Sequence, residues 1–221
     1  MREETLEAEL FGTDGVAVLS LFGMLNGTTH ARMRDLLLKT VLAQPTAVVV
    51  DLGNLAFERA TAAAVLRSVW HQVAEWPGVP ILVAPADRGG WPVPGYPSVR
   101  QALDAVGAPP RRRVVRLPLP LRGSAAFARL AAEETCRMWD LPGLAPDAAD
   151  TAGALVGLTS RGVRPTVVFE WWRGKFVVGV GEDVVVPCDA RALRRAAAGA
   201  RRCGWSTTWS DGTFVWAVLP G

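Results

Sequence analysis

The segment from residue 48 to residue 66 constrains the fold of this chain more than any other. It opens with three consecutive valines, whose β-branched side chains favour a strand that is covered on both faces. The turn-forming run at residues 51–54 follows, and a valine then recurs at every fourth position over residues 65–73, as on one apolar face of a helix. These features predict a buried strand, a short loop and a helix, with the hydroxyl of Thr61 at the start of the helix.

The segments on either side alternate strand and helix in the same way. This alternation indicates right-handed crossovers in a mostly parallel sheet that helices cover. A loop rich in proline and glycine at 85–97, a short helix at 98–106 and a strand near 113–117 complete this half. The predicted order before that loop is strand 16–22, a helix capped by Thr28 or Thr29, strand 46–51, helix 61–76 and strand 80–84.

The second half has a different pattern, and the run at residues 118–124, with two prolines and a glycine, separates it from the first. Two helices precede two β-hairpins with one helix between them, which indicates an α+β sandwich on an antiparallel sheet. We therefore predict two domains, at residues 1–121 and 126–221. The elements expected in the second are helices 125–139 and 147–158, strands 166–172 and 175–180 around Arg173-Gly174, helix 189–202, and strands 206–209 and 213–219 around Asp211-Gly212.

Composition and charge exclude several classes of protein. The net charge is only +3 at pH 7, and the arginine groups at 111–113 and 191–202 lack the interleaved aromatic residues of nucleic-acid-binding motifs. We interpret these arginines as solvated and expect no direct nucleic-acid partner. The longest apolar runs are strand-sized, and the acidic start at residues 1–4 lacks the apolar core of a secretory signal. We therefore expect no membrane span and a cytoplasmic location.

The cysteines do not indicate a metal site or a disulfide framework. Cys136, Cys188 and Cys203 are an odd number at wide spacing, and only His30 and His71 could join them as soft metal ligands. An enzyme that uses Cys188 or Cys203 as its nucleophile is one alternative. Because no histidine is near Cys188 in the sequence, a small buried or loop thiol is the preferred interpretation.

Two motifs in the first half follow the order and spacing of a known family. A predicted strand ends in Gly-Met-Leu-Asn at residues 23–26, and residues 51–66 run Asp-Leu-Gly-Asn-Leu-Ala-Phe-Glu-Arg-Ala-Thr-Ala-Ala-Ala-Val-Leu. With these motifs, residues 8–121 resemble the STAS fold of anti-sigma-factor antagonists. The resemblance places Thr61 on the serine that a partner kinase phosphorylates in that family. It also implies a partner-binding surface that contains Asn26, Glu58, Arg59 and Thr61.

The sequence departs from this family around the phosphate acceptor. Arg59, Ala60 and Ala62 stand where the family has an acidic residue, a first serine and a glycine. Thr61 keeps a hydroxyl, but a threonine ahead of an apolar helix is also explained as a helix N-cap, which contributes about 1 kcal/mol without any phosphorylation. Both interpretations of Thr61 stay open on the sequence alone.

The second half resembles the histidine-kinase-like (GHKL) ATPase fold of anti-sigma-factor kinases over residues 126–219. The likeness rests on the order and spacing of the two predicted helices and of the closing run Gly-Thr-Phe-Val-Trp-Ala-Val-Leu at residues 212–219. The fold expected for the whole chain is therefore α/β, with a STAS-type mixed sheet followed by an α+β sandwich of the histidine-kinase-like kind.

The groups that this ATPase chemistry needs are replaced. The resemblance places Ala154 at the general base and Leu158 at the magnesium ligand, and neither side chain can do that chemistry. Ala190 and Ala192 replace the two phosphate-loop glycines, whose lack of a side chain lets the backbone approach an anion. The polar residues left at the degenerate nucleotide site are Glu182, Asp183 and Arg191.

These resemblances imply a non-catalytic bacterial regulatory protein of the partner-switching type. Such a protein binds an anti-sigma factor or a kinase-like protein, holds no metal and no cofactor, and is switched by the roughly two negative charges of a phosphate on Thr61. The two domains could also bind each other, because fusion gives them a high effective concentration. The alternative is an ATP-dependent serine/threonine kinase that binds Mg-ATP with Arg191 and Glu182 in an atypical site.

Overall fold

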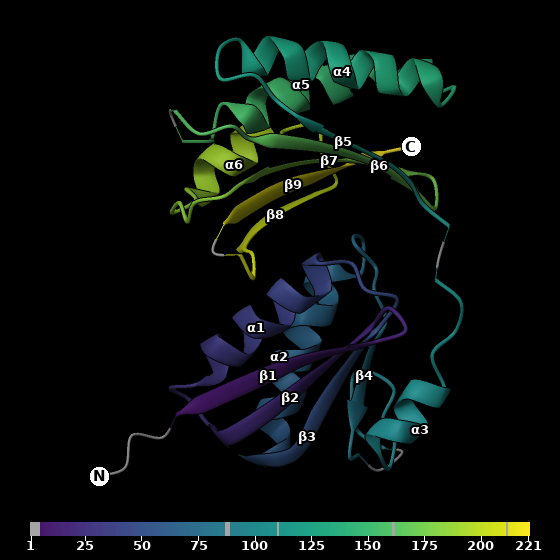
Figure 1. Ribbon diagram of the computed structural model, residues 1–221, viewed down its shortest axis with the longest axis vertical. Coiled ribbons are helices and arrows are strands. Elements are labelled where there is room, and N and C mark those ends of the chain that lie inside the picture. Colours follow the sequence, from purple (N-terminus) through teal and green to yellow (C-terminus); the bar gives the residue numbers. More distant parts are fainter. Residues whose placement is uncertain (1–4, 87–88, 110, 161, 211) are drawn as a thin grey trace. The chain divides into compact units, whose positions relative to one another are not determined.

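The computed structural model describes residues 5–86, 89–109, 111–160, 162–210 and 212–221, and its elements are labelled in Figure 1. The chain separates into two units, Met1–Pro110 and Arg111–Gly221. Each unit has its own sheet and its own apolar core, and the first sheet is mixed whereas the second is antiparallel. The predicted α/β fold class, with a mixed sheet followed by an antiparallel one, is confirmed.

Unit 1 is built on a four-stranded sheet in the order β1-β2-β3-β4, in which β2, β3 and β4 run parallel. Strand β1, which was not predicted, pairs antiparallel with β2 across a turn at Asp14 and Gly15, whose φ angles are +48° and +78°. The parallel strands confirm the predicted crossovers. The elements of unit 1 are β1 (Leu6–Thr13), β2 (Val16–Leu25), α1 (His30–Leu42), β3 (Val48–Phe57), α2 (Arg59–Val73), β4 (Ile81–Ala84) and α3 (Val99–Asp104).

The sheet of unit 1 is covered on both faces. Helices α1 and α2 lie side by side on one face, and α3 lies against the other (Figure 1). Because side chains alternate along a strand, Val48 and Val50 join the core under α1 and α2, whereas Val49 packs on the α3 side. All three valines are fully buried, as their β-branched run predicts.

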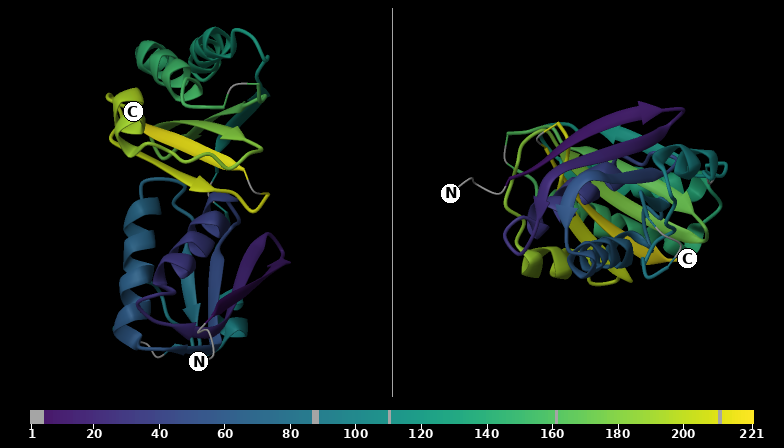
Figure 2. Two further views of the ribbon diagram at one scale, coloured as in Figure 1. Left: turned by 90° about the vertical axis from the view of Figure 1, so that its left-hand side faces the viewer. Right: turned by 90° about the horizontal axis from the view of Figure 1, so that it is seen from below.

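Unit 2 is a five-stranded antiparallel sheet in the order β5-β6-β7-β9-β8, with helices α4, α5 and α6 on one face (Figures 1 and 2). Helices α4 and α5 pack closely because the alanines on their facing sides, such as Ala128 and Ala152, are small and fully buried. The predicted turn at residues 173–174 is confirmed, with both φ angles positive. The elements are β5 (Arg113–Pro118), α4 (Ser124–Met138), a 3-10 helix (Pro142–Leu144), α5 (Ala145–Val156), β6 (Thr166–Trp172), β7 (Lys175–Glu182), α6 (Ala190–Ala196), β8 (Arg202–Thr207) and β9 (Thr213–Pro220).

The boundary between the units differs from the predicted one at residues 118–124. Strand β5, which was assigned to the first domain, pairs antiparallel with β6 and belongs to unit 2. Its Val115 and Leu117 pack on the apolar core of unit 2, and this long-range pairing decides where the strand belongs. The proline-rich run after it is only the connection from β5 into α4.

Two boundaries around Glu58 differ from the prediction: β3 continues through the run at residues 51–54 that was expected to be a loop, and α2 begins two residues earlier, at Arg59. The pairing of β2 with β3 moves from Ser20 opposite Asp51 to Phe22 opposite Asn54, so β3 holds one extra residue. The Asp51 Oδ1 atom accepts a hydrogen bond from the Gly53 N–H at 2.9 Å. Residues 51–54 are therefore a β-bulge within a strand that ends at Phe57.

Helix α6 is also shorter than predicted. It ends at Ala196 and not at residue 202, and the strand predicted at 206–209 begins earlier, as the edge strand β8 at Arg202–Thr207. Pairing with the long strand β9, from Arg202 opposite Val218 to Thr207 opposite Thr213, supplies strand hydrogen bonds that no local pattern reveals. Asp211 of the predicted turn and residues 1–4 of the acidic start lie outside the described residues.

Cys136 makes unit 2 sensitive to alkaline pH. Its side chain is fully buried in the core under α4, and this burial raises the pKa of the thiol from 9.0 to about 11. Because the pKa is higher in the folded state, the stabilisation is fully present below pH 9 and is lost as the pH rises through 11. A shift of this size corresponds to roughly 3 kcal/mol.

We predict that the free energy of unfolding, measured by urea denaturation, falls more steeply between pH 8.5 and pH 11.5 for the wild type than for Cys136→Ala. The two other cysteines are present in both proteins, so the difference between the two pH profiles isolates Cys136. Parallel profiles would contradict the assignment.

Candidate functional site

A hollow of about 330 Å³ opens in unit 1 at the carboxyl ends of the parallel strands β2 and β3. We call it the edge hollow. Ligands of open α/β sheets bind at this edge, because the loops that follow neighbouring strands meet there. Three of the four residues predicted to bind a partner, Asn26, Glu58 and Thr61, line the edge hollow. Its other lining residues are Met24, Leu25, Gly27, Ala56 and Phe57.

Asn26 organises the wall of the edge hollow that leads into α1. Its Oδ1 atom accepts hydrogen bonds from the N–H groups of Thr28 at 2.9 Å and Thr29 at 3.2 Å, and from the Thr28 hydroxyl at 2.7 Å. Thr29 occupies the N-cap position of α1, but its side chain makes no capping hydrogen bond and instead donates to the Met24 carbonyl at 2.8 Å. The predicted cap by Thr28 or Thr29 is therefore replaced by an Asn26-centred turn.

Thr61 is the third residue of α2 and not its N-cap. Glu58 occupies the N-cap position, and the Thr61 hydroxyl donates to the Glu58 carboxylate over 3.4 Å. The interpretation of Thr61 as the helix cap is therefore wrong. The first helical hydrogen bond of α2 runs from the Ala62 N–H to the Glu58 carbonyl, so the positive end of the helix dipole lies beside the hydroxyl. The half-buried Thr61 thus brings a modifiable oxygen to the wall of the edge hollow.

Arg59 does not line the edge hollow. Its guanidinium lies 5.3 Å from the centroid of the Trp91 ring and donates to the Gly89 carbonyl. Phe57 packs against the same ring, with 6.1 Å between the two centroids. Arg59 therefore holds the loop after β4 against the start of α2. The sequence alone did not indicate this role.

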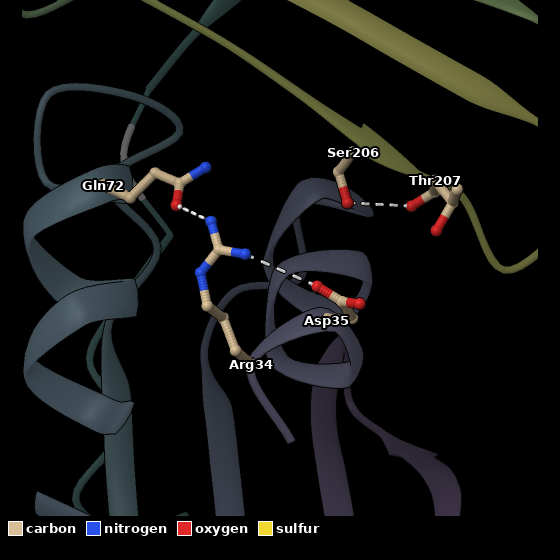
Figure 3. A network of polar contacts seen from close by, with 5 residues as sticks. All are labelled: Arg34, Asp35, Gln72, Ser206 and Thr207. Atoms are coloured by element: carbon tan, nitrogen blue, oxygen red, sulfur yellow. Dashed lines mark hydrogen bonds and ion pairs between the residues drawn. The ribbon is translucent and has the colours of Figure 1, made fainter. Parts of the chain in front are cut away.

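A hydrogen bond links α1 to α2, the two helices that follow Asn26 and Glu58. The Arg34 side chain of α1 donates to the Gln72 side chain of α2 at 2.9 Å and lies 3.6 Å from the Asp35 carboxylate (Figure 3). Figure 3 also shows the Ser206 hydroxyl of β8 donating to the Thr207 carbonyl at 3.0 Å, a contact within unit 2.

Unit 2 has a hollow of its own, about 280 Å³, which we call the β7–α6 hollow. Of the four positions of the degenerate nucleotide site, Leu158 and Glu182 line it, whereas Asp183 and Arg191 do not. Glu182 is only 7% exposed, and its Oε2 atom accepts from the Ser160 N–H at 2.9 Å. The full lining is Gly157, Leu158, Thr159, Val180, Glu182, Val186, Pro187, Cys188, Asp189, Ala192, Thr213 and Val215.

Leu158, which the sequence resemblance places at a magnesium-ligand position, lines the β7–α6 hollow, and its aliphatic side chain cannot ligate a metal ion. Across the described ranges, no three side chains of histidine, cysteine, aspartate or glutamate gather as a metal site would require. Nor does any helix within those ranges have the length and apolar character to cross a bilayer.

The cysteines are free and are not activated as nucleophiles. Burial, the Asp189 carboxylate and Cys203 raise the pKa of the Cys188 thiol. Burial also raises the pKa of Cys203, against a smaller opposing effect of Arg194. A thiol with a raised pKa holds little thiolate at neutral pH. The raised pKa values therefore do not favour an enzyme with Cys188 or Cys203 as its nucleophile.

Comparison with known proteins gives a resemblance among solved structures. Neither the known protein-family models nor the curated proteins include a match to this sequence. A crystal structure of an anti-sigma factor antagonist from Mycobacterium paratuberculosis is similar to part of the chain. It has 21% sequence identity and a TM-score of 0.38, over 47% of this chain and 96% of that one. A likeness at this level assigns no function to the chain.

We predict that Asn26→Ala lowers the free energy of unfolding by about 1 kcal/mol, because three donors ahead of α1 lose their acceptor. Asn26→Asp keeps an acceptor oxygen and retains most of that stability. Asn54→Ala, at an exposed position of β3, is the matched control and changes little. Equal losses for Asn26→Ala and Asn54→Ala in urea denaturation would contradict the role of Asn26.

Proposed function

We propose that this chain is a non-catalytic regulatory protein of the bacterial partner-switching type, which works in the cytoplasm. Unit 1 acts as an anti-sigma-factor antagonist-like module and binds an anti-sigma factor or kinase-like protein at the edge hollow. The observation that carries this proposal is that Asn26, Glu58 and Thr61 line one hollow, with a hydroxyl at the first turn of α2.

The Thr61–Glu58 contact supports a phosphorylation switch. A phosphate on Thr61 would add about two negative charges beside a carboxylate that lies 3.4 Å from the hydroxyl. The positive end of the α2 dipole favours the phosphate, whereas Glu58 and the phosphate repel each other, so Glu58 has to turn away. Modification of one oxygen would then change both the charge and the shape of the surface that the partner contacts.

Two residues of the β7–α6 hollow support a regulatory, non-catalytic role for unit 2. Leu158 cannot ligate magnesium, and Ala192 presents a methyl group where a phosphate loop needs a glycine. A phosphotransferase depends on positioning and charge stabilisation by such groups, each worth several kcal/mol in the transition state. We therefore propose that unit 2 is a degenerate, non-catalytic relative of a histidine-kinase-like ATPase and that it takes no cofactor.

We predict that Thr61→Glu weakens partner binding by about tenfold or more, because a charge is introduced into the interface. The measurement is quantitative mass spectrometry of proteins from the native cells that are retained on the immobilised chain. Thr61→Ser keeps the hydroxyl and retains the partner, and Ser68→Glu adds the same charge on an exposed face of α2 and also retains it. The same proteins retained equally by Thr61→Glu and Ser68→Glu would contradict a switch at Thr61.

We predict that Mg-ATP leaves the thermal unfolding of the chain unchanged, because the β7–α6 hollow has an aliphatic side chain at the magnesium position. A nucleotide present at a hundredfold its Kd would add about 2.7 kcal/mol of stability, which a thermal shift detects easily. Such a shift, together with transfer of phosphate to a protein substrate, would support the kinase instead.

A further inference from the structure

The β7–α6 hollow has the walls of a small-molecule site. Aliphatic side chains from four segments of unit 2 line it, and its volume of about 280 Å³ is enough for a single-ring compound. The aliphatic walls come from Leu158, Val180, Val186, Pro187 and Val215. Such walls favour a ligand with a compact apolar body.

The Glu182 carboxylate supplies the directional group of this hollow. Glu182 follows Val178 and Val180 at alternate positions of β7, so it points to the sheet face that α5 and α6 cover. It is only 7% exposed, and among the described residues its carboxylate accepts one hydrogen bond, from the Ser160 N–H. A carboxylate has about four lone-pair sites, so this single bond leaves capacity for a further donor inside the hollow.

The electrostatics of the hollow select against anions. Asp189 adds a second carboxylate to the lining, and the negative, carboxyl end of the α5 dipole lies at residues 157–159 of the wall. Among the described residues that line the hollow, none is arginine, lysine or histidine. A phosphate or carboxylate ligand would therefore meet the like charge of Glu182 and Asp189, with no basic side chain among the described lining residues to compensate it.

We infer that the β7–α6 hollow binds a small organic cation, in which an amine or amidinium group donates to the Glu182 carboxylate and an apolar body fills the aliphatic walls. The inference does not depend on the proposed partner binding, since every residue it uses lies in unit 2 and Thr61 lies in unit 1. A purely structural Glu182, which only holds the loop after α5 through Ser160, is the competing explanation.

The test uses the full chain and four single-ring probes: benzamidine and benzylamine as cations, benzamide as the neutral relative and benzoate as the anion. Binding is measured by chemical-shift titration in nuclear magnetic resonance and by calorimetry. We expect benzamidine and benzylamine to bind with saturation, benzamide to bind about tenfold more weakly, and benzoate not to bind.

Two matched variants separate ligand binding from folding. Glu182→Gln removes the charge but keeps an oxygen that accepts from the Ser160 N–H, so the chain stays folded while benzamidine binds about tenfold more weakly. Asp183→Asn removes the same charge from the next residue, which is exposed and outside the hollow, and leaves benzamidine binding unchanged.

Three results would overturn the inference. They are equal binding of benzamidine and benzoate, an unchanged affinity for benzamidine in Glu182→Gln, and an equal loss in Glu182→Gln and Asp183→Asn. None of these results bears on Thr61, so failure here leaves the partner-switching proposal standing, and failure of the Thr61→Glu prediction leaves this inference standing.

Discussion

The parallel pairing of β2 with β3 is the constraint on which the candidate site of unit 1 depends. Its last pair is Leu25 opposite Phe57, so Asn26 and Glu58 are the first residues beyond the paired ends of the two strands. The extra residue of the bulge after Asp51 sets that register. Without it, one strand would slip by one residue, and its side chains beyond that point would exchange faces. The bulge therefore places Asn26, Glu58 and the start of α2 at one edge.

The hollows of the two units are lined by different kinds of side chain. In unit 1 a hydroxyl, a carboxylate and an amide surround the edge hollow, which suits recognition of a protein surface and a response to added charge. In unit 2 the β7–α6 hollow has aliphatic walls, and its directional group is the buried Glu182 carboxylate. These walls are compatible with the binding of a small cation.

Local patterns in the sequence predicted the structural features that depend on residues close together in the chain. The buried valines of β3, the parallel order of β2, β3 and β4, and the turn at residues 173–174 follow from β-branching, periodicity and turn propensity. The extra strand β1 also had a local signal that was missed. Leu6, Ala8 and Leu10 alternate with glutamates, and an Asp-Gly turn follows them.

Other features needed contacts between distant segments. Strand β5 belongs to unit 2 because it pairs with β6, some 50 residues later, and no pattern within the strand reveals that partner. The start of α2 depended on the bulge, which exists only in the pairing of β2 with β3. The contact of Arg59 with Trp91 likewise joins the start of α2 to the loop after β4, two segments that are distant in the sequence. The site residues could be named from a family resemblance, but their gathering around one hollow could not.

The central claim is that a protein docks at the edge hollow, and site-specific photo-crosslinking tests it most directly. A photoreactive phenylalanine derivative is placed at Ala60, an exposed residue in the first turn of α2, or at Ser68, an exposed residue further along the same helix. The account predicts a covalent adduct with a protein of the native cells from position 60 and not from position 68, and loss of that adduct when Thr61→Glu is added. Equal adducts from both positions, or an adduct at position 60 that survives Thr61→Glu, would contradict it.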